Sequence, residues 1–247
     1  MTYLYRLVST IFLLLNFSIA FAENNVSTNE LFENKIRKFI LENPEVILDS
    51  LRNYEEKINI NAKKIQKELI ESEIVRSLDT RLDYVGGNLD GKITMFEFLD
   101  YKCGYCKKAH AEVKHLLKNN PEITLIIKEF PILGPESLLA AKASIAVLAN
   151  NGPSMYEEFT NKLINFNKKL NIDNILQLAK SIGADPQIIK LSLGSDSIAD
   201  ILNSNYTLAN KLNINGTPTF IIGTEIIRGY KNINALQEII NRKKQEL

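Results

Sequence analysis

The sequence predicts an α/β fold in which a long helical insertion interrupts a small sheet. Residues 93–99 and 123–127 are apolar runs typical of buried strands. Residues 136–212 have the apolar spacing of helices almost throughout, and a hairpin pattern over 220–227 follows them. Residues 23–80 precede the strands and also show helical spacing, which predicts an N-terminal helical extension.

The first 22 residues have the pattern of a secretory signal peptide. Arg6 is their only charge, an apolar run follows it, and residues 20–22 read Ala-Phe-Ala, which signal peptidase accepts. The apolar run is short beside the roughly 20 residues of a membrane span, although an uncleaved N-terminal anchor is the alternative. We therefore expect a mature protein located in the periplasm.

The charge balance excludes one broad class of partner. Loss of the signal peptide takes Arg6 from the 30 basic residues, and the remaining 29 equal the 29 acidic ones. A chain with no excess of positive charge has no general attraction for nucleic acid or an anionic membrane surface. We expect no nucleic-acid partner.

The extension over 23–80 carries apolar residues without enough sequence to enclose a core. Its pattern predicts one helix around Leu31 to Ile40, a second beginning at Asn43-Pro44, and a third over 65–78, with a polar stretch before the third. Apolar faces of this kind need a partner, either the main domain over 81–247 or a second copy of the chain. The extension is thus a possible oligomerisation arm.

Cys103 and Cys106 are the only cysteines, and they lie between a predicted strand and a predicted helix over 107–119. A disulfide-stabilised exported domain usually has several cysteine pairs spread over the fold. At a helix start, unpaired N–H groups and the helix dipole favour the Cys103 thiolate, and Cys106 lies one turn further on. The pair predicts reversible exchange between dithiol and disulfide.

Two other roles for the cysteine pair are weaker. A structural zinc site needs four ligands, and the whole chain has two cysteines and two histidines, with His110 on the same predicted helix as the pair. A purely stabilising disulfide closing so short a loop contributes only about 2 kcal/mol. We expect neither a metal nor a cofactor.

The motifs resemble the DsbA-like branch of the thioredoxin superfamily. The resemblance rests on Asp-Tyr-Lys-Cys-Gly-Tyr-Cys at 100–106, the helical insertion, and Gly-Thr-Pro-Thr-Phe at 216–220, and it covers about residues 84–247. It implies a thioredoxin-like fold and protein-disulfide oxidoreductase activity. It further implies that Pro218 is cis and faces the sulfurs, with Thr217 lining the substrate site. An ordinary trans proline at the start of an edge strand is the alternative.

Glu97 is a carboxylate inside an apolar strand, where it is costly unless paired or hydrogen-bonded. It lies six residues before Cys103, and the resemblance implies that it matches the buried acid thought to relay protons to the inner cysteine. Lys128 resembles the partner of that acid. We expect a Glu97–Lys128 pair beneath the disulfide that supports proton transfer. A strand-end salt bridge without a catalytic part is the alternative.

The direction of the reaction stays open. An oxidase would form disulfide bonds in exported proteins by transferring the Cys103–Cys106 disulfide to their thiols, and a membrane redox partner would reset it. An isomerase or reductase would act from the dithiol. Tyr105 stands where related oxidases often carry histidine, and this motif with Thr217 looks more like the isomerase pattern. A surface adhesin or chaperone with an inert disulfide is a third and weaker reading, against which the assembled redox motif argues.

Overall fold

The structure, a computed structural model, describes residues 29–80 and 83–246, so the predicted signal peptide lies outside the described residues. The chain divides into two compact units, Met1–Lys64 and Ile65–Leu247. Within the described ranges, no helix is long and apolar enough to cross a membrane.

The first unit contains a helical segment over 29–42 and the beginning of helix α2 (Glu45–Thr80). The predicted second and third helices are one continuous helix, so the separation predicted for them is wrong. Its 36 residues include neither glycine nor proline, and a polar stretch by itself does not stop a helix. No described residue over 29–64 is buried, in agreement with the expectation that this segment encloses no core of its own.

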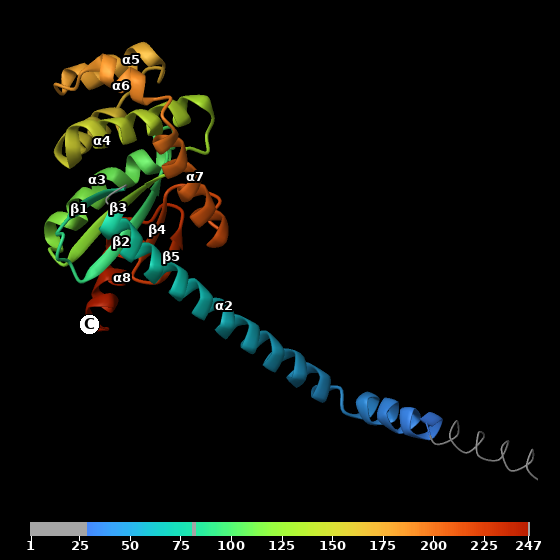
Figure 1. Ribbon diagram of the computed structural model, residues 1–247. Coiled ribbons are helices and arrows are strands. Elements are labelled where there is room, and N and C mark those ends of the chain that lie inside the picture. The colour runs from blue at the N-terminus through green and yellow to red at the C-terminus, as the bar shows by residue number, and fades with distance from the viewer. Residues whose placement is uncertain (1–28, 81–82, 247) are drawn as a thin grey trace, which may run out of the picture. The chain divides into compact units, whose positions relative to one another are not determined.

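The second unit contains a five-stranded mixed sheet with helices on its faces (Figure 1). Its strands are β1 (Tyr84–Gly87), β2 (Ile93–Leu99), β3 (Ile123–Glu129), β4 (Thr219–Ile222) and β5 (Glu225–Arg228). Its helices after α2 are α3 (Gly104–Asn119), α4 (Pro135–Ile164), α5 (Ile172–Ser181), α6 (Pro186–Ser192), α7 (Asp196–Lys211) and α8 (Ile233–Gln245). The strand order is β1-β3-β2-β4-β5, with β2 and β3 parallel and the other neighbours antiparallel. The predicted α/β class with a helical insertion is confirmed.

The breaks within the helical insertion follow from local sequence. Gly152 adopts a φ of 84°, which favours glycine, and with Pro153 it kinks α4. Asn171 caps α5 by accepting a hydrogen bond from the Asn174 N–H at 3.0 Å. Asp185 caps α6, whose first residue is a proline. Helices α4, α5 and α6 then pack on one another (Figure 1).

Side chains of β2 alternate between two hydrophobic clusters, one on each face of the sheet. Met95 and Leu99 join the cluster that contains buried residues of α3 and α8, whereas Phe96 and Phe98 join the cluster that contains residues of α2 and α7. Ile70 of α2 is fully buried in the second cluster, so the end of that helix is part of the sheet-containing unit. The division of the chain at residues 80 and 81 stays a prediction.

Candidate active site

Strand β2 delivers the cysteine motif to the first turn of α3. Cys103 is the N-cap residue of that helix, with extended backbone angles of φ −76° and ψ 114°, and its sulfur accepts a hydrogen bond from the Cys106 N–H at 3.3 Å. A thiolate there receives the otherwise unpaired N–H groups of the helix and lies at the positive end of its dipole. The cap position therefore makes Cys103 the anionic member of the pair.

The two thiols differ in exposure and in acidity. Cys103 is 8% exposed and Cys106 is fully buried, and both are free thiols. A hydrogen bond from the Cys106 thiol, helped by the N–H groups of Cys106 and Tyr105, lowers the pKa of Cys103 to about 5 against the effect of burial. The same hydrogen bond, together with burial, raises the pKa of Cys106. The arrangement gives one thiolate at neutral pH and keeps the inner thiol protonated.

The loop before β4 lies against the sulfur of Cys103. The Thr217–Pro218 peptide bond is cis, as the resemblance implied, and the Cys103 sulfur lies 3.2 Å from the Thr217 carbonyl oxygen, to which Cys103 donates a hydrogen bond when it is protonated. Because β4 pairs with β2, this loop lies at the end of the sheet where the cysteine motif begins. Cys103, Thr217 and Pro218 are therefore brought together from distant parts of the sequence.

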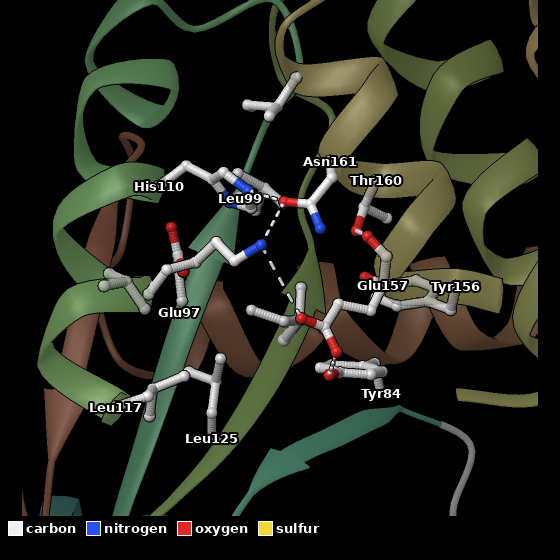
Figure 2. Close-up of a pocket in the computed structure, with 14 residues that line it drawn as sticks. Tyr84, Glu97, Leu99, His110, Leu117, Leu125, Tyr156, Glu157, Thr160 and Asn161 are labelled. Carbon is white, nitrogen blue, oxygen red and sulfur yellow. Dashed lines mark hydrogen bonds and ion pairs between the residues drawn. The ribbon is translucent and has the colours of Figure 1, made fainter. Parts of the chain in front are cut away.

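Glu97 lies on the α3 face of β2. It is 2% exposed, burial raises its pKa to about 8, and among the described residues its Oε1 has no hydrogen-bond partner and no basic side chain pairs with it. It lines a cavity of about 60 Å³ that has space for water, which needs about 10–15 Å³. Glu157 and Asn161 of α4 lie across this cavity from Glu97 (Figure 2). The buried Glu97 carboxyl group thus lies beside a cavity in which water could carry a proton to or from it.

A chain of polar contacts leads from this cavity toward the surface. His110 Nε2 is hydrogen-bonded to Asn161 Oδ1 at 2.6 Å, and Lys114 Nζ donates to the same oxygen at 3.1 Å (Figure 2). Lys114 also lies 3.9 Å from Glu157, and both of these side chains are about half exposed. Burial lowers the pKa of His110. His110, which the sequence places on the same predicted helix as the cysteine pair, lines the same cavity as Glu97.

The expected Glu97–Lys128 pair is wrong. In the parallel register of β2 and β3, Glu97 stands opposite Ile127 and Phe98 stands opposite Lys128, so the two charged side chains point to opposite faces of the sheet. Lys128 instead donates to Glu73 Oε1 at 2.5 Å, Asp83 Oδ2 at 2.6 Å and the Ser77 hydroxyl at 2.9 Å. The lysine secures the end of α2 to the sheet.

Asp100 is a buried acid that the sequence interpretation passed over. Its side chain accepts hydrogen bonds from the backbone N–H groups of Ile132 and Leu133 at 2.8 and 2.9 Å, and from the Ser137 hydroxyl at 2.7 Å. It also accepts one from the Lys102 N–H at 2.8 Å. These bonds fasten the loop that carries Cys103 to the loop before α4. Its place three residues before the first cysteine was the available signal.

Glu129 is a second buried acid that was missed. Its Oε1 accepts hydrogen bonds from the Tyr101 hydroxyl at 2.6 Å and the Tyr156 hydroxyl at 2.7 Å, while its Oε2 has no partner within the part of the chain that the structure describes. Burial raises its pKa to about 8. Tyr101 is two residues before Cys103, so this acid holds the approach to the motif in place. An acid directly after Lys128 in an apolar strand was the signal in the sequence.

The described residues contain no group of three or more histidine, cysteine, aspartate or glutamate side chains placed to hold a metal ion. The chemistry that the site can perform comes from the two sulfurs, their surrounding hydrogen bonds and the buried carboxyl group. Such a set supports thiol–disulfide exchange, in which a thiolate attacks a disulfide sulfur and a second thiolate leaves.

Comparison with known proteins agrees with this chemistry. A family model described as thioredoxin matches residues 79–242. A thioredoxin-like oxidoreductase from Silicibacter pomeroyi is 31% identical, with a TM-score of 0.64 over 68% of this chain and 95% of the other. The thiol-disulfide exchange protein alpha-DsbA2 of Wolbachia pipientis is 28% identical, with a TM-score of 0.65 over 73% and 96%.

Curated relatives fall into two groups. Disulfide bond formation protein D of Bacillus subtilis is 25% identical over 169 residues, which cover 64% of this chain and 75% of that protein. The Na(+)/H(+) antiporter NhaA 3 of Salinispora tropica is 25% identical over 165 residues, but the chain spans only 25% of the antiporter's length. The chain belongs to the thioredoxin family. Within it, the protein is a DsbA-like thiol–disulfide oxidoreductase.

Proposed function

We propose that the protein forms disulfide bonds in exported proteins by transferring its Cys103–Cys106 disulfide to pairs of client thiols. The observation that carries this proposal is the unequal acidity of the two cysteines, with the pKa of Cys103 lowered to about 5 and that of Cys106 raised. A stabilised thiolate favours the reduced enzyme, and the disulfide is then a better oxidant of clients. The Bacillus subtilis relative, disulfide bond formation protein D, supports the same direction by its name.

The reaction runs through a mixed disulfide. A client thiolate attacks the Cys103 sulfur, a client–Cys103 bond forms, the Cys103–Cys106 bond breaks, and Cys106 leaves as a thiolate that takes up a proton. A second client thiolate then attacks the client sulfur of the mixed disulfide. The client disulfide forms, and Cys103 leaves as the stabilised thiolate. A membrane redox partner takes the two electrons from the dithiol and restores the enzyme disulfide.

Glu97 exchanges the proton that Cys106 must gain and lose. Its pKa of about 8 lies near neutral pH, where a general acid or base is most effective. The cavity beside it and the contacts of His110 with Asn161 provide a polar route to the surface. Lys128, which the sequence predicted to support proton transfer with Glu97, supports the fold instead, because its contacts are with Glu73, Ser77 and Asp83.

Thr217 and Pro218 form the surface on which the client chain lies. The Thr217 carbonyl is 3.2 Å from the Cys103 sulfur, so a client joined to that sulfur lies beside residues 216–218. An extended client segment can pair there with exposed backbone groups, which is the usual way in which a strand is added to a sheet edge.

An isomerase acting from the dithiol is the second candidate. The observation that favours it is the segment over 29–64, where large apolar side chains such as Phe32, Phe39 and Leu51 are more than half exposed. A second copy of the chain would cover them, and a closed homo-oligomer would hold several Cys103 sulfurs near one client.

The predicted cleavage after residue 22 and a periplasmic location are tested by N-terminal sequencing of the protein from cell fractions.

Activity assays and a mass measurement separate the oxidase from the isomerase. The mature protein is then assayed with a reduced client and with the same client carrying scrambled disulfides. Faster oxidation of the reduced client, with little activity on the scrambled one, supports the oxidase. An oligomeric mass by light scattering, combined with activity on the scrambled client that is lost without residues 23–64, would reverse the assignment.

A further inference from the structure

Two tyrosine rings lie at the active site without a part in the thiol chemistry. Tyr105 is in the first turn of α3, between the cysteines in sequence, and is 63% exposed. Tyr230 follows β5 and is partly exposed. The two rings stack with their centroids 6.0 Å apart and their planes at 28°. Tyr230 packs partly against the main hydrophobic cluster, but the exposed Tyr105 ring contributes little to a folded core, so its position two residues from Cys103 requires another explanation.

Backbone contacts place this pair beside the path of the client. The Gly229 N–H donates to the Pro218 carbonyl at 2.9 Å, which brings the residue before Tyr230 against the loop that bonds to Cys103. Tyr105 is two residues after Cys103 on the other side of the sulfur. Tyr105 is thus close to Cys103 in the sequence, and Tyr230 is joined through Gly229 to the loop that contacts Cys103. Both rings therefore lie near a mixed disulfide formed on Cys103.

Tyr230 is held in position rather than left to rotate. Its hydroxyl donates a hydrogen bond to Glu112 Oε1, and the Lys108 ammonium lies 5.0 Å from the centre of its ring. A fixed ring loses little conformational freedom when another group stacks on it. The charge of Lys108 also decides which group can bind, because it repels a lysine or arginine that would otherwise be attracted to a tyrosine face.

We propose that Tyr105 and Tyr230 form a subsite that binds an aromatic side chain adjacent to the reacting cysteine of a client polypeptide. The inference rests on the proposed function, since a client must first form a mixed disulfide with Cys103. Neighbouring residues of an extended client are about 3.3 Å apart along the chain, so the residue next to the cysteine lies within reach of the rings. Aromatic stacking of this kind changes a rate or binding constant by about three- to tenfold.

The test uses the oxidised full-length protein and short reduced peptides of the form Xaa-Cys-Xaa in a common flanking sequence, with Xaa as Phe, Ser or Arg. The rate constant for mixed-disulfide formation is measured for each peptide at one pH and salt concentration. The wild-type protein is expected to react about three- to tenfold faster with the Phe peptide than with the Ser peptide, and no faster with the Arg peptide.

Variants assign the preference to the two rings. Tyr105→Ser and Tyr230→Ala should each move the Phe-to-Ser ratio toward one, and Tyr105→Phe should keep it. Leu89→Ser is the matched control, because Leu89 is 65% exposed but precedes β2, at the opposite end of the strand from the cysteine motif. Tyr105 is exposed enough that its variants do not depend on repacking a core.

The outcomes distinguish the subsite from the activity itself. A wild-type ratio of one, or a ratio that both tyrosine variants leave unchanged, overturns the subsite. Reaction with dithiothreitol is measured in parallel, and failure of the wild-type disulfide to react with dithiothreitol or any peptide overturns the proposed function. A peptide preference that is lost equally in Leu89→Ser also removes the assignment to these rings.

Discussion

Each face of the central sheet buries an ionisable side chain, Lys128 on one face and Glu97 on the other, and the surroundings of these two side chains differ. Lys128 is fully buried and has three hydrogen-bond partners, two of them carboxylates. Glu97 is almost as deeply buried, yet its Oε1 has no hydrogen-bond partner among the residues that the structure describes, and a cavity lies beside it. A buried charge with full pairing stabilises architecture, while a buried acid kept without a counter-charge has a pKa suited to proton transfer.

The largest expected effect concerns the cysteines on the Glu97 face. Cys106→Ala should accumulate clients that carry a disulfide: the acidic Cys103 thiolate attacks the client disulfide, the other client sulfur leaves as a thiolate, and Cys106 is not there to attack the mixed disulfide and release the client. Cys103→Ala should lose exchange activity to the background level and trap little. Non-reducing gels of both variants, incubated with the same client, make the comparison. Equal trapping by both variants would contradict the division of labour.

On the opposite face, Lys128→Met should mainly lower stability. It removes the buried cation from Glu73 and Asp83, which keep their ion pairs with Arg76, so the loss should be below the roughly 3–5 kcal/mol of a fully broken buried pair. For a domain of this size the thermal midpoint should fall by less than about 20 °C. The exchange rate measured well below that midpoint should stay close to wild type. A large loss of rate in fully folded Lys128→Met would return the lysine to the chemistry.

Glu97→Gln should lower the exchange rate and leave stability unchanged, which is the reverse of the result expected for Lys128→Met. The amide keeps the shape of the side chain but cannot carry the proton, so we expect exchange to slow by about tenfold or more, at the low end of general acid–base effects. Stability near pH 8 should not fall, since no described basic side chain pairs with the acid and the substitution breaks no ion pair there. Stopped-flow exchange and thermal unfolding, measured on one preparation, test both halves. Lower stability with an unchanged rate would leave Glu97 a structural residue.

The smallest effect, when taken over a single pH unit, is in the pH dependence of stability. The pKa of Glu97 is about 8 in the folded protein and about 4.5 in the unfolded chain, so between these values the native state binds the extra proton. The free energy of unfolding therefore falls as the pH rises through this window, by up to about 1.4 kcal/mol per pH unit for the group. Glu129 adds a decline of the same sign. Glu97→Gln should flatten the decline, and an unchanged slope would contradict the raised pKa.

Local features of the fold were predictable because neighbouring residues set them. The apolar run of β2, the cap position of Cys103 and the helix breaks at Gly152 and Asp185 follow from nearby sequence. The cis bond before Pro218 came from the family motif rather than from local physics. These elements supplied the two sulfurs and the loop that faces Cys103.

Features that depend on strand register or on distant partners were not predictable. The faces of Glu97 and Lys128 depend on how β2 and β3 align, and a shift of one residue reverses the face. The partners of Lys128 come from α2 and from Asp83, which no spacing rule connects to it. Tyr230 meets Tyr105 only because β5 returns beside β4.

The most direct test of the central claim is the reduction potential of the Cys103–Cys106 pair, measured by equilibration with a glutathione redox buffer. The acidic Cys103 thiolate stabilises the reduced protein, and the proposed oxidase predicts a potential between about −120 and −180 mV. A value near −270 mV, typical of a thioredoxin-like reductant, would contradict the claim that the disulfide is donated to clients.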